Sequence, residues 1–267
     1  MHAAIEDLRA ESEMRHRATL YRLARPWDEL PNALGSAAAY TPAAGGTVLR
    51  MSGTREAHWP FFDLSVHTPR LELRYATDAL LLELCEVAHD VVTPGTLPFD
   101  GDASFYDRTP AGRRRWLAGQ WSARARTSPG WWVLVFAVMV DGRAVGTQEL
   151  TGAEFPALRT VETFSWLTRP YQGRGFGREM REAVLHLAFA GLGAQRAMSE
   201  AFEDNAPSCG VSRSLGYQRE GTTWALRGGE PAAMARYVLP HATWLARRRN
   251  DIEITGLDAC LAPLRLA

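Results

Sequence analysis

The chain has 267 residues, of which 46% are hydrophobic and 22% charged, a composition typical of a soluble globular protein. Its 30 basic and 30 acidic residues cancel, which argues against a polyanion-binding protein and against nucleic acid as a partner. The sequence contains no lysine, so a lysine nucleophile or a lysine general base is excluded.

The three cysteines are scattered and form neither a CxxC pair nor a cluster with histidine. We therefore expect no metal site and a reducing compartment. The first residues are charged and lack the apolar core of a secretory signal. The longest apolar run, WWVLVFAVMV, has about half the length that a membrane span needs. These features predict a cytoplasmic protein without a membrane partner.

The N-terminal part differs in composition from the rest of the chain. Residues 2–24 show a loose helical period that ends at Pro26, and residues 35–46 have the composition of a linker. One interpretation is an appendage, residues 1–54, attached to a compact domain of residues 55–267. The other is a helix that packs on that domain as ordinary structure, and both stay open.

Strand and helix patterns alternate in the part of the chain after residue 55. Residues 71–75 alternate apolar and charged side chains and predict a strand. Asp78 is expected to cap the helix ALLLELCEVAH that follows. An irregular segment over residues 90–110 then leads into a basic helix over residues 113–125.

The second half of the chain predicts three strands in meander order, then helices and strands in alternation. The first strand is continuously apolar, as a strand buried on both faces should be, and the turn Asp141-Gly142 joins it to the second. The predicted strands are 131–140, 144–150, 160–168, 195–202, 218–226 and 232–239, and the predicted helices are 175–191 and 205–216. We expect an α/β (α+β) fold, a mixed sheet with helices on both faces.

One segment, LTRPYQGRGFGR over residues 167–178, lies between a predicted strand and a predicted helix. Its glycines, Gly173, Gly175 and Gly177, permit a tight turn and a close approach to a ligand. The helix N-terminus favours a phosphate, and Arg174 and Arg178 add positive charge that can pair with phosphate oxygens. The segment therefore predicts a cradle for a diphosphate.

Three kinds of phosphate-binding loop compete for this segment, beside a glycine-rich turn without any ligand. A Walker loop needs a lysine, which the chain lacks. A dinucleotide-binding loop reads GxGxxG after the first strand, whereas the glycines here are spaced GxGxG after the fourth predicted strand. The third kind is the [QR]xxGx[GA] loop of the GCN5-related N-acetyltransferase (GNAT) superfamily, which Gln172, Gly175 and Gly177 match.

A second segment supports this resemblance. The residues Asn205-Ala206-Pro207-Ser208 through Ser214-Leu215-Gly216-Tyr217 are similar to the NxxS…LG(F/Y) helix of the superfamily. TPRLELRYAT and VETFSWLTRPYQGRGFG resemble the RimJ/RimL-like branch, the ribosomal-protein-alanine N-acetyltransferases. The resemblance covers residues 68–240 and implies the GNAT fold, a largely antiparallel sheet that is splayed between the fourth and fifth predicted strands.

The resemblance implies an acyl-CoA-dependent N-acyltransferase that uses acetyl-CoA, or another short-chain acyl-CoA, and acts on a peptide N-terminus. The diphosphate would lie on the backbone between Gly173 and Gly177, with the pantetheine chain along the preceding strand and Asn205 beside it. The implied cofactor-binding residues are Trp166, Leu167, Thr168, Gln172, Gly173, Arg174, Gly175, Phe176, Gly177, Arg178, Asn205 and Ser208.

The resemblance also implies catalytic residues. Glu162 on the fourth predicted strand is the expected general base, and Glu149 is the reserve candidate. Many members protonate the leaving thiolate with a tyrosine at the position where this chain has Ser212, so Ser208 is the expected substitute. Backbone N–H groups near Leu167 are expected to hold the carbonyl oxygen.

The acceptor is the part of the reaction that the sequence defines least. Residues 91–109 are either an acceptor pocket or a solvated loop, and the side chains that suggest a pocket are Phe99, Phe105, Tyr106, Asp100, Asp102 and Asp107. Two other functions stay open: acetyl or succinyl transfer to a small-molecule amine, and acyl-CoA binding by a regulator without catalysis. The oligomeric state also stays open, with a homodimer as one alternative.

Overall fold

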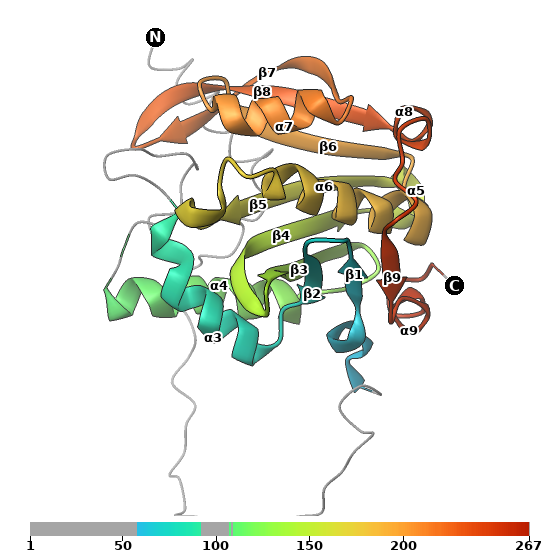
Figure 1. The fold of residues 1–267 in the computed structure, drawn as a ribbon, viewed down its shortest axis with the longest axis horizontal. Coiled ribbons are helices and arrows are strands. Elements are labelled where there is room, and N and C mark those ends of the chain that lie inside the picture. Colours follow the sequence, from blue (N-terminus) through green and yellow to red (C-terminus); the bar gives the residue numbers. More distant parts are fainter. Residues whose placement is uncertain (1–57, 92–106, 108, 267) are drawn as a thin grey trace, which may run out of the picture.

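A computed structural model describes residues 58–91, 107 and 109–266 of the chain (Figure 1). The expected N-terminal appendage lies outside these residues. So do five side chains of the expected acceptor pocket, namely Phe99, Asp100, Asp102, Phe105 and Tyr106. Asp107 is described, and its carboxylate pairs with Arg115 and accepts the backbone N–H of Thr109.

The described strands form one mixed sheet in the order β7-β8-β6-β5-β4-β3-β2-β1-β9. The strands are β1 (Ser65–His67), β2 (Glu72–Tyr75), β3 (Trp131–Val140), β4 (Arg143–Ala153), β5 (Thr160–Leu167), β6 (Arg196–Phe202), β7 (Gln218–Arg227), β8 (Glu230–Pro240) and β9 (Glu253–Thr255). Of the described strand pairs, only β5 and β6 run parallel. The predicted mixed, largely antiparallel sheet is confirmed.

Strands β3 and β4 form the centre of the molecule. All of β3 after Trp131 is buried, as its continuous apolar sequence predicts, because helices cover both faces of the sheet. The hairpin turn has φ +49° at Asp141 and +76° at Gly142. Two consecutive positive φ values match the right-handed twist of the flanking strands.

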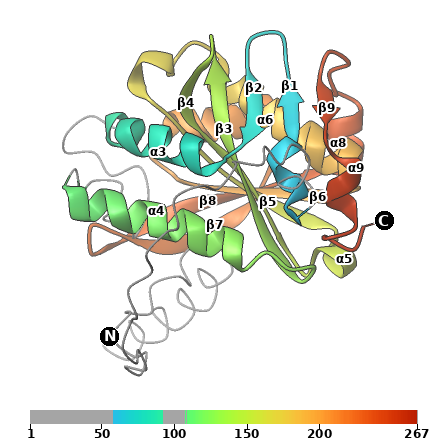
Figure 2. The same cartoon turned by 90° about the horizontal axis from the view of Figure 1, so that it is seen from below.

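Helices cover the two faces of the sheet. Figures 1 and 2 show α6 and α7 on one face and α3 and α4 side by side on the other. The main helices are α3 (Asp78–Val87), α4 (Pro110–Ala125), α6 (Phe176–His186), which continues as a π-turn over Leu187–Gly191, and α7 (Ala206–Ser214). Short turns of helix are η2 (Pro60–Asp63), η3 (Ala88–Asp90), α5 (Phe155–Leu158), η5 (Arg169–Tyr171), α8 (His241–Leu245) and α9 (Asp258–Leu261).

Two large clusters of buried apolar side chains follow from this arrangement, beside a third that contains only Phe202, Ala225 and Met234. The larger one includes Leu134 and Phe136 of β3 with Met180 and Val184 of α6. The smaller one packs the other side of β3 against α3 and α4, with Trp116 among its members. None of the described helices combines the length and the apolar character needed to cross a bilayer.

The expected cap of α3 by Asp78 is wrong. The helix begins one residue earlier than such a cap requires, because Thr77 is the N-cap and its hydroxyl accepts the backbone N–H of Leu80 at 3.3 Å. The Asp78 carboxylate instead accepts hydrogen bonds from Trp121 at 3.1 Å and from Arg124 at 2.6 Å. Asp78 therefore joins the start of α3 to the end of α4.

Two short strands, β1 and β9, were not predicted. Val66 of β1 pairs with Leu73 of β2 on one side and with Ile254 of β9 on the other. Gly256 follows β9 with φ +72°, and a Cβ atom there would clash with the carbonyl of Asp63. The C-terminal segment thereby covers an edge of the sheet that would otherwise be free to pair with another chain.

Candidate functional site

The sheet forks between β5 and β6. Their parallel pairing covers Thr160 to Glu162 and ends at the pair Glu162 and Met198. A single further link follows, from the Thr163 hydroxyl to the Met198 carbonyl at 3.3 Å. The pairing of β5 with β4 continues to Leu167, whereas β6 separates from β5 and stays paired with β8. We call the space between residues 163–167 and residues 199–202 the fork.

The backbone of β5 presents hydrogen-bond donors to the fork. The N–H of Thr168 donates to the carbonyl of Val145 beyond the end of β4, at 2.9 Å. Because the N–H groups of an antiparallel strand alternate in direction, those of Leu167 and Ser165 point the other way, towards the fork. An extended ligand chain can therefore add to this edge as a further strand would.

The loop after β5 holds a set of backbone N–H groups without acceptors. Gly173 has φ +69° and Gly175 has φ +85°, a left-handed conformation that glycine adopts without strain. In the described part of the chain, no carbonyl accepts the N–H groups of residues 173–178 until Glu179 donates to Gly175. Residues 172–175 are exposed. These free donors at the N-terminus of α6 form a site for an anion such as a diphosphate.

Gln172 supports this loop from within. Its side-chain amide donates to the carbonyl of Leu167 at 2.7 Å and to the carbonyl of Val91 at 2.8 Å. Its backbone N–H donates to Arg169. Gln172 therefore fixes the loop against the ends of β5 and α3, with its own donors already engaged.

A buried carboxylate ties α6 to the β1–β2 connection. Glu179, in the first turn of α6, accepts from Arg70 Nε at 2.5 Å and from the Thr68 hydroxyl at 2.7 Å. Arg70 also donates to the carbonyl of Arg174 at 3.2 Å and lies over the ring of Phe176. This Arg70–Glu179 clamp was not foreseen from the sequence, and it holds the start of α6 in place.

The two arginines of the loop differ in their surroundings. Arg174 makes no ion pair with a described carboxylate and lies against the rings of Tyr171 and Phe176. Arg178 pairs with Glu182 at 3.0 Å, which also accepts from Arg249 at 2.9 Å. Arg174 is therefore the loop arginine whose charge is available to a diphosphate.

The start of α7 matches the second sequence motif. The Asn205 side chain caps the helix by accepting the backbone N–H of Ser208 at 3.2 Å. Ser208 is half-buried in the first turn of α7, the helix that packs on β6. Ser212 is buried and its hydroxyl has no partner in the described residues. Ser208 is thus the more accessible of the two hydroxyls.

The four remaining expected cofactor residues contribute differently. The side chains of Leu167 and Phe176 belong to the larger apolar cluster, and that of Trp166 belongs to the smaller one. The Thr168 hydroxyl donates to the carbonyl of Val145. The side chains of these four residues are therefore already engaged, and a ligand could bond only to the backbone N–H groups of Leu167 and Phe176.

The two candidate bases lie on the face that α3 and α4 cover (Figure 2). Glu162 is paired with Thr151, two residues from Glu149, so both carboxylates occupy neighbouring positions of one face. Glu162 is half-buried, whereas Glu149 is only 2% exposed and one of its oxygens has no partner in the described residues. Burial raises the pKa of Glu149 to about 8, because desolvation disfavours its charged form.

A buried arginine at the closed end of the fork was missed in the sequence. Arg181 of α6 is 5% exposed and donates to Ser199 of β6 at 3.0 Å and to Ser165 of β5 at 3.2 Å. The sequence feature that could have indicated Arg181 is its position, three residues before Val184 and inside the apolar stripe of α6. The pattern of one helix does not tell whether such a residue flanks the stripe or points inward.

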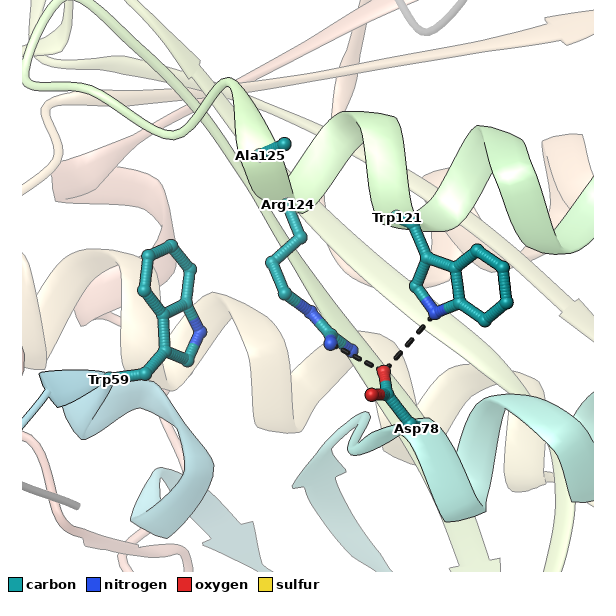
Figure 3. Close-up of a pocket in the computed structure, with 5 residues that line it drawn as sticks. All are labelled: Trp59, Asp78, Trp121, Arg124 and Ala125. Atoms are coloured by element: carbon teal, nitrogen blue, oxygen red, sulfur yellow. Dashed lines mark hydrogen bonds and ion pairs between the residues drawn. The ribbon is translucent and has the colours of Figure 1, made fainter. Parts of the chain in front are cut away.

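One cavity of the described residues lies away from the loop. It measures about 330 Å³ and lies between the start of α3 and the end of α4, lined by Trp59, Asp78, Trp121, Arg124 and Ala125 (Figure 3). Its polar groups already bond to one another, as Figure 3 shows for Asp78, Trp121 and Arg124. A second cavity of about 240 Å³ lies beside α6 and shares only Arg178 with the loop. The second cavity is lined by four arginines, Arg178, Arg247, Arg248 and Arg249, and by one carboxylate, that of Glu182.

Comparisons with known proteins identify a family and a shared fold. Residues 70–218 match the family model of the acetyltransferase (GNAT) domain. Among solved structures, a GCN5-related N-acetyltransferase from Brucella melitensis is 21% identical, with a TM-score of 0.54, covering 68% of this chain and 80% of the other.

Two further structures are of ribosomal-protein acetyltransferase type. The ribosomal-protein-S5-alanine acetyltransferase from Vibrio fischeri is 16% identical, with a TM-score of 0.55, covering 67% of this chain and 98% of the other. Mycobacterium smegmatis RimJ in complex with CoA-disulfide is 17% identical, with a TM-score of 0.55, covering 73% of this chain and 98% of the other. At these identities the likeness shows a shared fold.

Proposed function

Since the chain belongs to the acetyltransferase (GNAT) family, whose members acetylate amines with acetyl-CoA, we propose that its acceptor is the α-amine of a protein N-terminus. The coenzyme fits the N-terminus of α6. The observation that carries this assignment is the set of N–H groups of residues 173–178, which no described backbone carbonyl accepts. Such a set of donors, with the helix dipole behind it, matches the charge and size of a diphosphate.

The fork would hold the rest of the coenzyme. The N–H groups of Leu167 and Ser165 would bond the pantetheine chain and the carbonyl oxygen, in the way that an added strand bonds to a sheet edge. Asn205 and Ser208 at the start of α7 would flank this chain from the β6 side. When bound, acetyl-CoA supplies the thioester carbonyl that the amine attacks.

Glu162 would remove the proton from the attacking amine. It is half-buried on the face where Glu149 also lies, so it can be reached, whereas Glu149 is enclosed. An α-amine has a reference pKa of about 8, so it needs only modest help to lose its proton near neutral pH. Ser208 would donate a hydrogen bond to the leaving sulfur as the C–N bond forms and the C–S bond breaks.

The preference for a protein N-terminus is supported by the kind of protein that shares the fold. The neighbours include a ribosomal-protein-S5-alanine acetyltransferase and RimJ. The lower demand that an α-amine places on a base also favours it over a lysine side chain, whose reference pKa is about 10.4. A small-molecule amine is the alternative that the experiment must exclude.

The test is thiol release from acetyl-CoA by the full chain, with peptides that begin with alanine or serine, the same peptides blocked at the α-amine, and a panel of small amines. We expect thiol release and acetylated product only with the free α-amines, read by mass spectrometry. If only the small amines gave acetylated product, the acceptor would be a small-molecule amine and not a protein N-terminus. Binding of acetyl-CoA without thiol release from any amine would indicate a regulator.

A further inference from the structure

The closed end of the fork contains a positive charge that nothing in the described chain neutralises. Arg181 is 5% exposed, and no described carboxylate lies within ion-pair distance of it. A guanidinium keeps its proton at any physiological pH, so it cannot escape burial by becoming neutral. A buried charge without a counter-charge is costly.

The groups around Arg181 are hydroxyls and not acids. Its two terminal nitrogens donate to Ser199 and Ser165, and its Nε has no partner in the described residues. The phenol of Tyr217 is buried without a described hydrogen-bond partner. Burial raises the pKa of Tyr217, and the charge of Arg181 opposes this rise. The cluster thus offers several donors and no anion.

The position of this cluster relates it to the acyl donor. Ser165 lies on the strand whose free edge would bind the pantetheine chain, and Ser199 lies directly after the last backbone pair that joins β6 to β5. A chain bound along β5 from the N-terminus of α6 inwards would run towards Ser165 and Ser199, the two hydrogen-bond partners of Arg181. The inner end of that chain carries the acyl group, because the diphosphate marks the outer end of the coenzyme.

We propose that Arg181 binds a carboxylate at the distal end of the transferred acyl group, so that a dicarboxylic acyl-CoA such as succinyl-CoA is the preferred donor. The proposal rests on the proposed coenzyme site. Acetyl-CoA remains a donor, because its shorter acyl group leaves the guanidinium to water. Transfer balances as for acetyl: the amine nitrogen bonds the thioester carbon, the C–S bond breaks, and the amine proton ends on the coenzyme thiol.

The test is calorimetric titration of the full chain with succinyl-CoA and butyryl-CoA, which share a four-carbon acyl chain and differ in the terminal carboxylate. A charge-assisted hydrogen bond in a buried site predicts that succinyl-CoA binds about 10-fold or more tightly. Arg181→Met is expected to abolish that preference and to leave the affinity for butyryl-CoA within about 3-fold. Arg196→Met removes an exposed arginine three residues before Ser199 and should keep the preference.

The design separates this proposal from the proposed function. Butyryl-CoA and succinyl-CoA that bind equally well, or a preference that persists in Arg181→Met, would overturn the role of Arg181 and leave the coenzyme site intact. No binding of either donor would overturn the coenzyme site itself. If Arg181→Met does not fold, Ser199→Ala keeps the charge and removes one of its supports, and an unchanged preference in that variant would also count against the proposal.

Discussion

Glu149 and Glu162 occupy neighbouring positions on one face of the sheet and differ chiefly in how far each is enclosed. Desolvation raises the pKa of Glu149 to about 8, so its carboxyl carries a proton at neutral pH and is a poor base there. This difference, and not the sequence position, favours Glu162 as the residue that deprotonates the amine.

Replacing Glu162 by glutamine tests that assignment. We expect kcat to fall by roughly 10- to 100-fold, at the low end of what general bases contribute, because positioning of amine and thioester alone supplies much of the rate. The dissociation constant of acetyl-CoA should stay the same, since Glu162 lies on the face away from α6. Steady-state rates and calorimetry measure the two quantities. An unchanged kcat in Glu162→Gln would remove the residue from the mechanism.

The raised pKa of Glu149 predicts a pH dependence of stability. The unfolded carboxyl ionises near pH 4.5, whereas the folded one keeps its proton until about pH 8, so stability falls as the pH rises between these values. Glu149→Gln removes this loss, which is on the order of a few kcal/mol. The variant should therefore melt about 10 °C above the wild type at pH 9 and close to it at pH 4. Equal melting curves at pH 9 would contradict an enclosed, neutral Glu149.

The elements of the candidate site were predictable from the sequence to different degrees. The glycine loop and the Asn205 cap were predicted because each depends on residues that are close in the chain. The predicted cap of α3 was Asp78, whereas the structure has Thr77. The Asp78 carboxylate is not available as a cap because it accepts hydrogen bonds from Trp121 and Arg124, which lie far away in the sequence. Local patterns do not contain that information.

Pairing between distant segments accounts for what was missed. Val66 and Ile254 lie in three-residue strands that are too short to show a period and that are defined by their pairing with other segments. Arg181 was missed for the same reason, because its serine partners lie on two strands that the sequence does not place beside α6. The Arg70–Glu179 clamp joins residues 109 positions apart.

That clamp predicts a link between α6 and coenzyme affinity. Arg70→Met leaves the Glu179 carboxylate buried with the Thr68 hydroxyl alone. Because Arg70 is 49% exposed, we expect a loss of stability of only about 1–2 kcal/mol, with several-fold weaker acetyl-CoA binding as the start of α6 loosens. Arg74→Met, which breaks the exposed pair with Glu72 on β2, is the matched control and should change neither. Equal coenzyme affinity in both variants would show that the clamp does not affect coenzyme binding.

At the scale of the whole molecule, the described residues form one sheet with two large apolar clusters, and the match to the family begins at residue 70. We propose that residues 55–267 form the acyltransferase domain and that residues 1–54 are an appendage to it. The pairing of β1 with β9 and the clamp between Arg70 and Glu179 both join segments within residues 55–267.

Deletion of residues 1–54 tests this division. We expect the shortened chain to melt within about 2 °C of the full chain and to bind acetyl-CoA equally well, as changes outside a domain core do. Thermal unfolding and calorimetry on both chains give the comparison. A drop of many degrees would show that the segment packs on the domain as ordinary structure.

The claim on which the other proposals depend is that the backbone N–H groups of residues 173–178 bind the diphosphate of the coenzyme. Amide NMR spectra of the labelled chain, recorded during titration with acetyl-CoA, observe these groups directly. The account predicts large, saturable shifts of the amide signals of residues 173–178, which S-acetylpantetheine, lacking the diphosphate, does not reproduce. Binding of acetyl-CoA that shifts other amides and leaves these unmoved would contradict it.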